Sequence, residues 1–334
     1  MPRVLVTPVE LIRRQEPCQD VLDAAGFEIV YPPEQMNLYD EQRLTEHLRG
    51  IDAMLAGIER LTAQVLSSSS LKVIARFGVG YDAIDIPAAT QLGIAVAITP
   101  GTNQISVAEH MLALLLGVMR GFPERDQTVR DGTWRRVVLP RLAGKTLGLL
   151  GLGRIGKEVV PRAQAFGVKV IASESYPDLE FVRKNDVELM DFEQLLERSD
   201  ILSLHLPCTH LTTKIINAEA LAKMRPGSIL INTARGGLVD EEALSDALES
   251  GHIWGAGLDA FNVEPLSISS RLLQLPHVLV APHMGGLDSD SVRAMGKLAA
   301  ELIVKLHRGE AVPSDCLVNL TLQQAWNWKI GETR

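Results

Sequence analysis

A glycine-rich segment near the middle of the chain has the residue types and spacing of a dinucleotide-binding turn. An apolar run ends in a Gly-x-Gly-x-x-Gly pattern, and a helix-forming stretch over residues 157–166 follows. In such turns the first glycine permits a tight bend, the second lets the backbone approach a pyrophosphate, and the third lets helix and strand pack closely. The helix N-terminus also offers free N–H groups and a positive dipole end to phosphates. The predicted cofactor contacts in this turn are Gly151, Gly153, Arg154, Ile155 and Gly156.

An acidic residue follows the glycine turn at the distance where dinucleotide-binding domains place the residue that contacts the ribose. A second apolar run over residues 168–172 leads to Glu174, which lies 18 residues after Gly156. A carboxylate there can accept hydrogen bonds from a ribose 2′-hydroxyl, and it repels a 2′-phosphate. The neighbours Ser173 and Ser175 offer no positive charge to hold that phosphate. The sequence therefore favours NAD over NADP as cofactor, and a solvated surface acid is the alternative interpretation of Glu174.

Three further residues have side chains that could take part in catalysis, and each follows a predicted strand. Arg235 follows the apolar run 228–232. Glu264 lies in a loop after a short strand, and His283 follows the run 278–280. Reduction of a ketone needs a proton at the carbonyl oxygen, which a histidine can deliver and take back. A carboxylate beside a histidine raises the histidine's pKa and fixes its tautomer, and a guanidinium can hold a substrate carboxylate. Singly, the three could be an ion-pair partner, a loop acid and a capped surface histidine. With the dinucleotide turn they predict a hydride-transfer site.

The composition indicates a globular protein of two domains. The chain has 334 residues, 46% of them hydrophobic, and a net charge of −8 from 41 acidic and 33 basic residues. This balance argues against nucleic acid or an acidic membrane surface as partner, so an anionic substrate needs a local cluster of positive groups. Cys18, Cys208 and Cys316 are scattered and match neither a disulfide framework nor a zinc pattern. No signal peptide is visible, and the apolar residues 111–119 are too few to span a bilayer. We therefore expect no metal and a cytoplasmic location.

Strands and helices alternate along the whole chain, which predicts an α/β fold with parallel sheets. We expect two Rossmann-like, doubly wound domains, with an NAD-binding domain (residues 99–289) inserted into a substrate domain (residues 1–98 and 290–334). The predicted strands are 4–7, 53–56, 72–76, 94–97, 146–150, 168–172, 201–204, 228–232, 256–258 and 278–280, and helices are predicted at 20–25, 40–48 and 241–249.

A turn-rich segment over residues 99–103 is a hinge candidate between the two series of strands. Ser106 and Glu109 have the spacing of a capping box, which predicts a helix start there. The helix runs to about Arg120 and is apolar on nearly every face, so it must be buried on several sides. A second subunit could cover one side, which predicts a homodimer. Burial within one chain is the alternative.

The C-terminal part of the chain contains one long helical pattern. Residues 289–307 are amphipathic, and Gly309 marks the end of the helix. We expect this helix to return to the first domain. Trp326 and Trp328 follow in a polar tail to which the sequence assigns no role.

The chain resembles the D-isomer-specific 2-hydroxyacid dehydrogenases, a family that includes phosphoglycerate dehydrogenase and glyoxylate/hydroxypyruvate reductases. The resemblance covers residues 4–309 and is specific because several motifs occur in the same order and spacing. These motifs are Gly151-Leu152-Gly153-Arg154-Ile155-Gly156, Asn232-Thr233-Ala234-Arg235-Gly236, Leu258-Asp259-Ala260-Phe261 with Glu264-Pro265, and Pro282-His283-Met284-Gly285-Gly286.

The resemblance implies roles for individual residues. Arg235, Glu264 and His283 fall on the family's catalytic positions. The loop Gly78-Val79-Gly80 falls where backbone N–H groups meet the substrate carboxylate, which fits an anion-binding nest of glycines, with a plain turn as alternative. Arg76 precedes the loop and either adds charge for an anionic substrate or pairs with an acid. The further cofactor contacts implied are Pro207, Thr212, Thr233, Ala234, Asp259, which is expected near the nicotinamide, and Gly286.

The expected function is an NAD-dependent oxidoreductase that interconverts a small D-2-hydroxy acid and its 2-keto acid. Relatives often have Asp at the position of Glu174, so the ribose contact here involves a longer side chain. Glu264 argues against formate dehydrogenases, which the resemblance associates with Gln at this position. Cys208 is expected near the cofactor as a small filler. The alternatives are an NAD-sensing binding protein like the corepressors of this fold, and a phosphite dehydrogenase.

Overall fold

The protein divides into two compact units, which we describe separately. The structure, a computed structural model, describes residues 1–334 except 13–15, 35, 39, 320–327 and 329–334. Unit 1 holds residues 1–103 and 287–334, and unit 2 holds residues 104–286. The boundaries expected from the sequence fall within five residues of this division. Both units are α/β with parallel sheets, as predicted.

Unit 1 is built around a parallel sheet with the strand order β2-β1-β3-β4-β5. The central strands are short apolar runs that are buried on both faces, as in parallel sheets covered by helices. After β1 the chain forms β2 on one side of β1, and it then crosses over to form β3 on the other side. The direction in which strands are added therefore changes between β1 and β3, which is the switch point of the sheet. Open sheets of this order bind ligands there, at the carboxyl ends of the strands. The strands are β1 (Arg3–Val6), β2 (Glu28–Val30), β3 (Ala53–Ala56), β4 (Val73–Arg76) and β5 (Ala95–Ala97).

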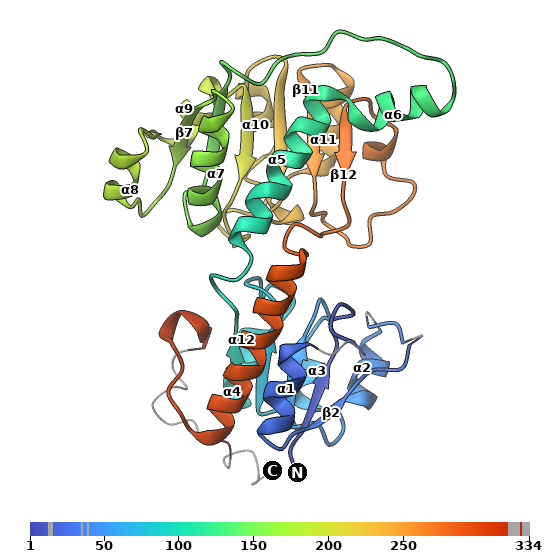
Figure 1. Ribbon diagram of the computed structural model, residues 1–334, viewed down its shortest axis with the longest axis vertical. Helices are drawn as coiled ribbons and strands as arrows, with labels where there is room; N and C mark the ends of the chain where they lie inside the picture. Colours follow the sequence, from blue (N-terminus) through green and yellow to red (C-terminus); the bar gives the residue numbers. More distant parts are fainter. Residues whose placement is uncertain (13–15, 35, 39, 320–327, 329–334) are drawn as a thin grey trace. The chain divides into compact units, whose positions relative to one another are not determined.

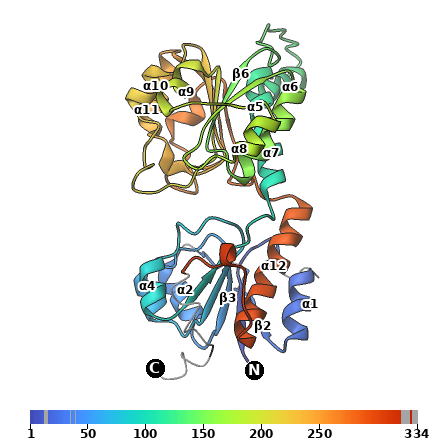
Figure 2. The same cartoon turned by 90° about the vertical axis from the view of Figure 1, so that its left-hand side faces the viewer.

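Helices cover both faces of this sheet, as Figures 1 and 2 show. One face packs against two helices, one of which is the C-terminal helix that the sequence expected to rejoin this domain. The other face packs against three short helices. The first group is α1 (Pro17–Ala24) and α12 (Ser289–Arg308), and the second is α2 (Glu41–His47), α3 (Ala63–Ser67) and α4 (Ile86–Gln91).

Side-chain caps and a glycine fix the ends of the unit 1 helices. Asp40 accepts hydrogen bonds from the first turn of α2, and Asp288 does the same for α12. These caps satisfy N–H groups that have no partner within the helix. Gly309 ends α12 with a φ of 71°, a left-handed conformation that glycine adopts without steric cost, so the predicted helix end is confirmed.

Trp328, to which the sequence assigns no role, packs against unit 1. Its ring lies edge-on to Phe27, at 6.1 Å between centroids, and to His307, at 4.5 Å. The ammonium group of Lys72 lies 5.2 Å from the indole centroid. Trp328 therefore contacts both His307 of α12 and Lys72, which precedes β4. Trp326 lies outside the described residues.

Unit 2 contains a parallel sheet with the strand order β12-β11-β10-β9-β6-β7-β8. Its direction of growth changes between β6 and β9, which places a second switch point at their carboxyl ends. All strand pairs in the sheet are parallel, so these carboxyl ends share one edge. The strands are β6 (Thr146–Leu150), β7 (Lys169–Ser173), β8 (Glu188–Leu189), β9 (Ile201–Leu204), β10 (Ser228–Asn232), β11 (Ile253–Leu258) and β12 (Val278–Val280).

The helices of unit 2 lie on both faces of its sheet (Figure 2). The cluster of buried residues on one face includes residues of α5, α7 and α8, and the cluster on the other includes residues of α9, α10 and α11. The helices are α5 (Gln104–Arg120), α6 (Phe122–Arg130), α7 (Arg154–Ala165), α8 (Leu179–Lys184), α9 (Phe192–Arg198), α10 (Ala218–Lys223) and α11 (Glu241–Glu249), with 3-10 turns η1 (Gly236–Leu238), η2 (Arg271–Gln274) and η3 (Ser314–Cys316, in unit 1).

Helix α5 is apolar on most sides because its own unit surrounds it. It packs against α7 and against strands β10, β11 and β12. The approach to the sheet is close, since a Cβ on Gly117 would lie 2.5 Å from Leu279. Burial within one chain thus accounts for its composition. The predicted capping box is wrong, because the helix begins at Gln104 and Ser106 is buried inside its first turn.

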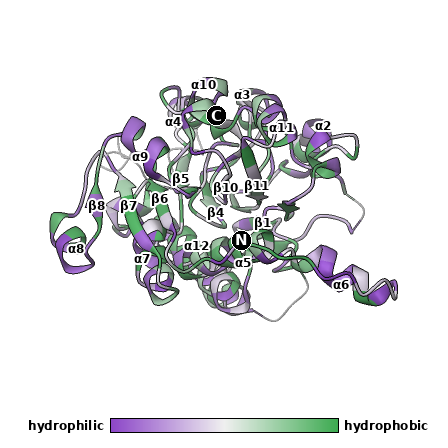
Figure 3. Ribbon diagram, turned by 90° about the horizontal axis from the view of Figure 1, so that it is seen from above, coloured by the Kyte–Doolittle hydropathy of each residue, from purple (hydrophilic) through white to green (hydrophobic). Residues whose placement is uncertain are grey.

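Helix α6 and the segment after it extend away from the sheet of unit 2. We call residues 121–141 the arm. In Figures 1 and 3 it projects outward, and the hydropathy colours of α6 are mostly hydrophilic, unlike those of the strands. No residue of α6 is buried. Several large apolar side chains on the arm are nevertheless exposed, among them Phe122, Val129 and Trp134.

Among the described residues, no single helix is long and apolar enough to cross a membrane. Helices α5 and α6 reach the required length and hydropathy only when taken together. A bend of 58° separates them at the break.

Candidate active site and dinucleotide turn

The glycine turn after β6 has the geometry that its sequence predicts. Gly151 has a φ of 98° and donates its N–H to Ser173 O, at 2.9 Å. A side chain there would collide with the carbonyl oxygen of His205. A Cβ on Gly156 would lie 2.6 Å from Gly151 O, whereas a Cβ on Gly153 would meet no atom within 4 Å. The first and third glycines thus permit close packing, and the second leaves the backbone open to a ligand.

Helix α7 begins directly at this turn. Gly153 is its N-cap, and Arg154 and Ile155 are its first residues, three residues earlier than the sequence predicts. No side chain caps the N-terminus of the helix. Its first N–H groups and positive dipole end therefore fit the pyrophosphate of a dinucleotide.

Glu174 lies at the carboxyl end of β7, beside the glycine turn. One carboxylate oxygen accepts a hydrogen bond from Leu152 N, at 2.8 Å, and the other from Tyr176 N, at 3.0 Å. These bonds fix the carboxylate next to the site where the turn would hold a phosphate. Each oxygen keeps a free lone pair, so it can accept a further hydrogen bond from a ribose hydroxyl.

His283 and Glu264 form a hydrogen-bonded pair. His283 Nδ1 lies 2.7 Å from Glu264 Oε2, while Glu264 Oε1 accepts a hydrogen bond from Phe261 N at 2.9 Å. Burial acts to raise the pKa of Glu264, but the hydrogen bond and charge of His283, the Phe261 N–H and the charge of Arg235 together hold it below its ordinary value. The carboxylate is therefore ionised at neutral pH and orients the imidazole.

Asp259, at the end of β11, holds the backbone that carries His283. Its two oxygens accept hydrogen bonds from Met284 N, at 2.9 Å, and Gly285 N, at 2.8 Å. His283 itself has a φ of 53°, an unusual conformation for a residue with a Cβ. The buried aspartate fixes this turn and thereby the direction of the ring. Its place near a nicotinamide stays a prediction.

His110, on α5, is a neighbour of Asp259 that sequence reasoning missed. Its Nε2 lies 3.2 Å from Asp259 Oδ1. The two residues are 149 positions apart and share no motif, so only the packing of α5 against β11 brings them together. The histidine adds a further polar neighbour to the carboxylate that orders the His283 turn.

Arg235 lies at the carboxyl end of β10. Asn232 shapes the turn, since its side chain donates to Arg235 O and accepts from Ala234 N. The turn lies against the loop after β11, because a side chain on Gly236 would overlap the backbone of Phe261. Strands β10, β11 and β12 are neighbours, so Arg235, Glu264 and His283 share one edge of the sheet.

The other predicted cofactor residues also follow strands of this sheet. Pro207 and Thr212 lie in the loop after β9, where Thr212 Oγ1 donates to Pro207 O at 2.8 Å. Thr233 and Ala234 follow β10, and within the described residues the buried Thr233 hydroxyl has no hydrogen-bond partner. Gly286 lies in the loop after β12, three residues after His283.

Cys208 is half-buried beside the β10 turn. Its Sγ lies 2.9 Å from where a Cβ on Gly237 would stand, and 3.7 Å from Thr213 Oγ1. It packs against the core between the sheet and α10 and α11. This environment agrees with its expected role as a small filler.

The predicted substrate loop lies in unit 1, after β4. Arg76 is the last residue of that strand, and Gly78 has a φ of 132°. The Gly78 N–H donates to Thr99 Oγ1, at 3.0 Å, so it does not face a substrate. Within the described residues, the N–H groups of Val79 and Gly80 donate no hydrogen bond. Of the three backbone donors expected in this loop, only the N–H groups of Val79 and Gly80 remain candidates.

A family model and several known proteins match this chain. Residues 112–285 match the model of the D-isomer specific 2-hydroxyacid dehydrogenase NAD-binding domain. A D-3-phosphoglycerate dehydrogenase of Mycobacterium tuberculosis is 42% identical over 278 residues, which are 82% of this chain and 52% of the relative. This chain thus spans about half the length of that relative. A hydroxypyruvate reductase of Thermotoga maritima is 38% identical over 297 residues, covering 86% of this chain and 96% of the relative.

A solved structure has the same fold. The TT0316 protein from Thermus thermophilus superposes with a TM-score of 0.84 at 36% sequence identity. The match covers 95% of this chain and 99% of that chain. Both units therefore have counterparts in that chain.

Proposed function

The chain belongs to the D-isomer-specific 2-hydroxyacid dehydrogenase family, and from this premise we propose that it is an NAD-dependent oxidoreductase that interconverts a small D-2-hydroxy acid and its 2-keto acid. The observation that carries the proposal is the hydrogen bond of 2.7 Å between His283 Nδ1 and an ionised Glu264, at the sheet edge that also holds Arg235. This set can move a proton beside an anionic substrate. The relatives' names point to substrates of the phosphoglycerate, hydroxypyruvate or glyoxylate type.

His283 is the proton donor and acceptor in this proposal. Because Nδ1 faces the Glu264 carboxylate, that nitrogen carries a proton and Nε2 is left to exchange one with the substrate oxygen. In reduction the protonated ring gives its proton to the carbonyl oxygen, and in oxidation the neutral ring takes it from the hydroxyl. Bound NADH or NAD supplies or accepts the hydride at the substrate carbon.

Arg235 holds the substrate. Its guanidinium offers paired N–H donors to a carboxylate and polarises a neighbouring carbonyl. In the loop after β4, to which the resemblance assigns a contact with the substrate carboxylate, the N–H groups of Val79 and Gly80 are the proposed donors, because neither has a partner among the described residues. Asp259 keeps the His283 turn in place and does not take part in proton transfer.

The cofactor is NAD rather than NADP in this proposal. Glu174 is fixed by two backbone N–H groups beside the glycine turn, so it cannot easily move away from a 2′-phosphate. A fixed carboxylate accepts hydrogen bonds from a ribose diol and repels the extra phosphate.

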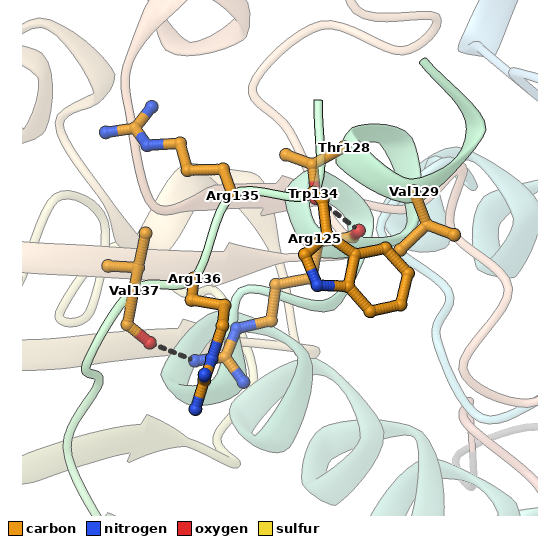
Figure 4. A pocket seen from close by; sticks show the side chains of 7 residues that line it. All are labelled: Arg125, Thr128, Val129, Trp134, Arg135, Arg136 and Val137. Atoms are coloured by element: carbon orange, nitrogen blue, oxygen red, sulfur yellow. Dashed lines mark hydrogen bonds between the residues drawn. The ribbon is translucent and has the colours of Figure 1, made fainter. Parts of the chain in front are cut away.

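We also propose that the protein is a homodimer, now on the evidence of the arm rather than of α5. Trp134 is 72% exposed and Val138 is 99% exposed, although both are large and apolar. Figure 4 shows a hollow on the arm that is lined by seven residues, with Arg125 donating to Val137 O at 2.9 Å. Exposed apolar groups on a projecting segment are typical of subunit contacts. A cytoplasmic location stays a prediction from composition.

Sedimentation equilibrium at micromolar concentration tests the assembly. The expected mass is twice that of the 36.5 kDa chain. Trp134→Ser should weaken the dimer, since it removes an exposed apolar group from the arm. A strict monomer in the unaltered protein contradicts the proposal.

An activity screen tests the enzymatic function. The purified chain is mixed with NADH or NADPH and a panel of 2-keto acids, and with NAD and the matching D- and L-hydroxy acids. We expect turnover of a small 2-keto acid with NADH, and of D- but not L-hydroxy acids with NAD. NADH binding without turnover of any acid supports a binding protein instead. Oxidation of phosphite without activity on any carbon acid supports a phosphite dehydrogenase.

A further inference from the structure

A buried threonine anchors the loop after β4 in unit 1. Thr99 lies two residues after β5 and is 0% exposed. Its N–H donates to Gly78 O, at 3.0 Å, and its hydroxyl accepts from Gly78 N, also at 3.0 Å. The two residues are 21 positions apart, and strands β4 and β5, which precede them, are neighbours in the sheet. Both backbone polar groups of Gly78 are therefore bonded to one residue.

The Thr99 hydroxyl also bonds to the loop as a donor. Its hydrogen can go to Gly78 O, at 3.2 Å, or to Arg76 O, at 3.5 Å. Gly78 N also donates to Arg76 O, at 2.9 Å, so the hydroxyl bonds to both ends of a tight turn. A hydroxyl has one hydrogen and two lone pairs, so it can bond to an N–H and a carbonyl at the same time. A valine side chain at position 99 could bond to neither.

The backbone that leads to Thr99 is held by the C-terminal segment. Strand β5 lies at the edge of its sheet, and Leu317 pairs with Ala97 in the antiparallel sense. Ile98 N donates to Cys316 O, at 2.8 Å. The segment thus covers the edge of β5 that no other strand of the sheet pairs with. Thr99 is therefore held in place by contacts that do not involve the loop after β4.

The bond to Gly78 O also fixes the direction of the next N–H group. The carbonyl of Gly78 and the N–H of Val79 belong to one planar, trans peptide group, so they point in opposite directions. Thr99 lies on the carbonyl side, and the Val79 N–H therefore points away from Thr99. A rotation of this peptide group would break the bonds to Thr99.

Burial divides the loop in the same way. Gly78 is buried, whereas Val79 and Gly80 are half-buried. The N–H groups of Val79 and Gly80 donate no hydrogen bond within the described residues. The loop thus has one anchored residue inside the unit, followed by two residues whose donors are available to a ligand.

We propose that Thr99 is a positioning residue for substrate binding: it holds the Gly78 carbonyl and thereby directs the Val79 N–H toward the substrate carboxylate. This inference rests on the proposed function, which assigns the Val79 and Gly80 donors to that carboxylate. Thr99 itself does not touch the substrate. Its loss should therefore weaken binding of the acid, and it should leave the hydride and proton transfer of bound substrate nearly unchanged.

The test uses Thr99→Val in the full chain, with glyoxylate and 3-hydroxypyruvate as substrates and NADH as cofactor. Valine keeps the branched shape and the backbone N–H but lacks the hydroxyl. The KM for both acids should rise by about threefold to tenfold, the range that one neutral hydrogen bond supports. Turnover at saturating acid should change by less than about twofold, because the loss is the same in the ground state and the transition state.

An inhibitor measures the same binding without turnover. Oxamate keeps the carboxylate of a 2-keto acid but is not reduced, so its inhibition constant should rise by the same factor as the KM. The affinity for NADH, measured by fluorescence titration, should not change. Thr99→Ser keeps the hydroxyl and should restore most of the binding. Thr99→Ala lacks the hydroxyl and adds no bulk, so it replaces Thr99→Val in the test if that variant does not fold.

Thr90→Val is the matched control for lost stability. The Thr90 hydroxyl on α4 donates to Ile86 O, at 2.8 Å, and accepts from Asn319 Nδ2, at 3.2 Å. Thr90 is also a threonine of unit 1 that bonds to a distant segment, but it does not contact the loop after β4. Thr90→Val should lower the unfolding temperature without changing the KM or the inhibition by oxamate.

The outcomes separate the inference from the proposed function. The inference is overturned by an unchanged KM and unchanged oxamate inhibition in the variant without the hydroxyl, or by an equal rise in Thr99→Ser or Thr90→Val. A loss of turnover with an unchanged KM overturns it as well. If the unaltered protein reduces no 2-keto acid, the proposed function fails. If it reduces them but none of these constants depends on the Thr99 hydroxyl, only the inference fails.

Discussion

The carboxyl groups at the edges of the two sheets differ in their surroundings. In unit 2 the central groups are already paired, since Glu264 binds His283 and Phe261 N, and Asp259 binds two backbone N–H groups. In unit 1 the buried Glu59 carboxyl lies near the Thr7 hydroxyl and the Arg76 charge. The net pKa shift is downward for Glu264, whose hydrogen bonds outweigh burial, and upward for Glu59, where burial outweighs them.

The difference fits the proposed proton transfer in unit 2. A proton relay works best when its groups are fixed in one geometry before the substrate arrives, because no reorganisation is then needed in the transition state. The comparison therefore predicts that changes in unit 2 cause the largest losses of rate.

The largest effect is expected for His283→Ala. This change removes the proton donor and should lower kcat by about 10²–10⁴, the usual contribution of general acid–base catalysis. The affinity for NADH, measured by fluorescence titration, should hardly change because the ring faces the reacting oxygen rather than the pyrophosphate. His47→Ala, at an exposed histidine of unit 1, is the matched control. Near-full turnover in His283→Ala would show that the relay is assigned to the wrong residue.

Glu264→Gln should move the pH profile as well as the rate. The Glu264 carboxylate is ionised at neutral pH, and its charge favours the protonated imidazole. Without that charge, the imidazole loses its proton at a lower pH. The decline of reduction with rising pH should begin at a lower pH, and the rise of oxidation with pH should shift in the same direction. Steady-state rates in both directions between pH 5 and pH 10 measure this.

Glu241→Gln is the matched control for that profile. Glu241 also accepts a hydrogen bond from the loop after β11, at Asn262 N, but it does not touch His283. Its change should leave the pH profile where it is. Equal shifts in both variants would mean that general charge in the loop, rather than the pair, sets the profile.

Much of the fold is predictable from the sequence because the inner strands are short apolar runs buried on both faces. The predicted runs 146–150, 201–204 and 228–232 agree with observed inner strands, and the run 278–280 agrees with the edge strand β12. Strands β2 and β8 were missed. They are two or three residues long, contain Glu28 and Glu188, and lie at sheet edges where one side needs no apolar residues.

In the site, contacts within a motif were predictable from the sequence, whereas contacts between residues far apart in the chain were not. The glycine turn and the pair of Glu264 with His283 could be anticipated from motifs and strand exits, because parallel strands bring their carboxyl ends to one edge. The contact of His110 with Asp259 and the bond from Gly78 N to Thr99 could not be anticipated. These depend on residues far apart in the chain, and no local pattern encodes them.

The smallest effect in this series is expected for the cofactor preference. Glu174→Gln removes the negative charge but keeps a carbonyl oxygen that can still accept the hydrogen bond from Leu152 N, so the glycine turn should stay intact. The preference for NADH over NADPH in kcat/KM should then narrow by about tenfold, since repulsion of the 2′-phosphate is lost while no positive group is gained to bind it. Glu174→Ala should narrow it similarly but also lower the unfolding temperature, because Leu152 N and Tyr176 N lose their acceptor. If the unaltered protein uses both cofactors equally, or if Glu174→Gln leaves the preference unchanged, then Glu174 only braces the turn and a different residue of unit 2 must select the cofactor.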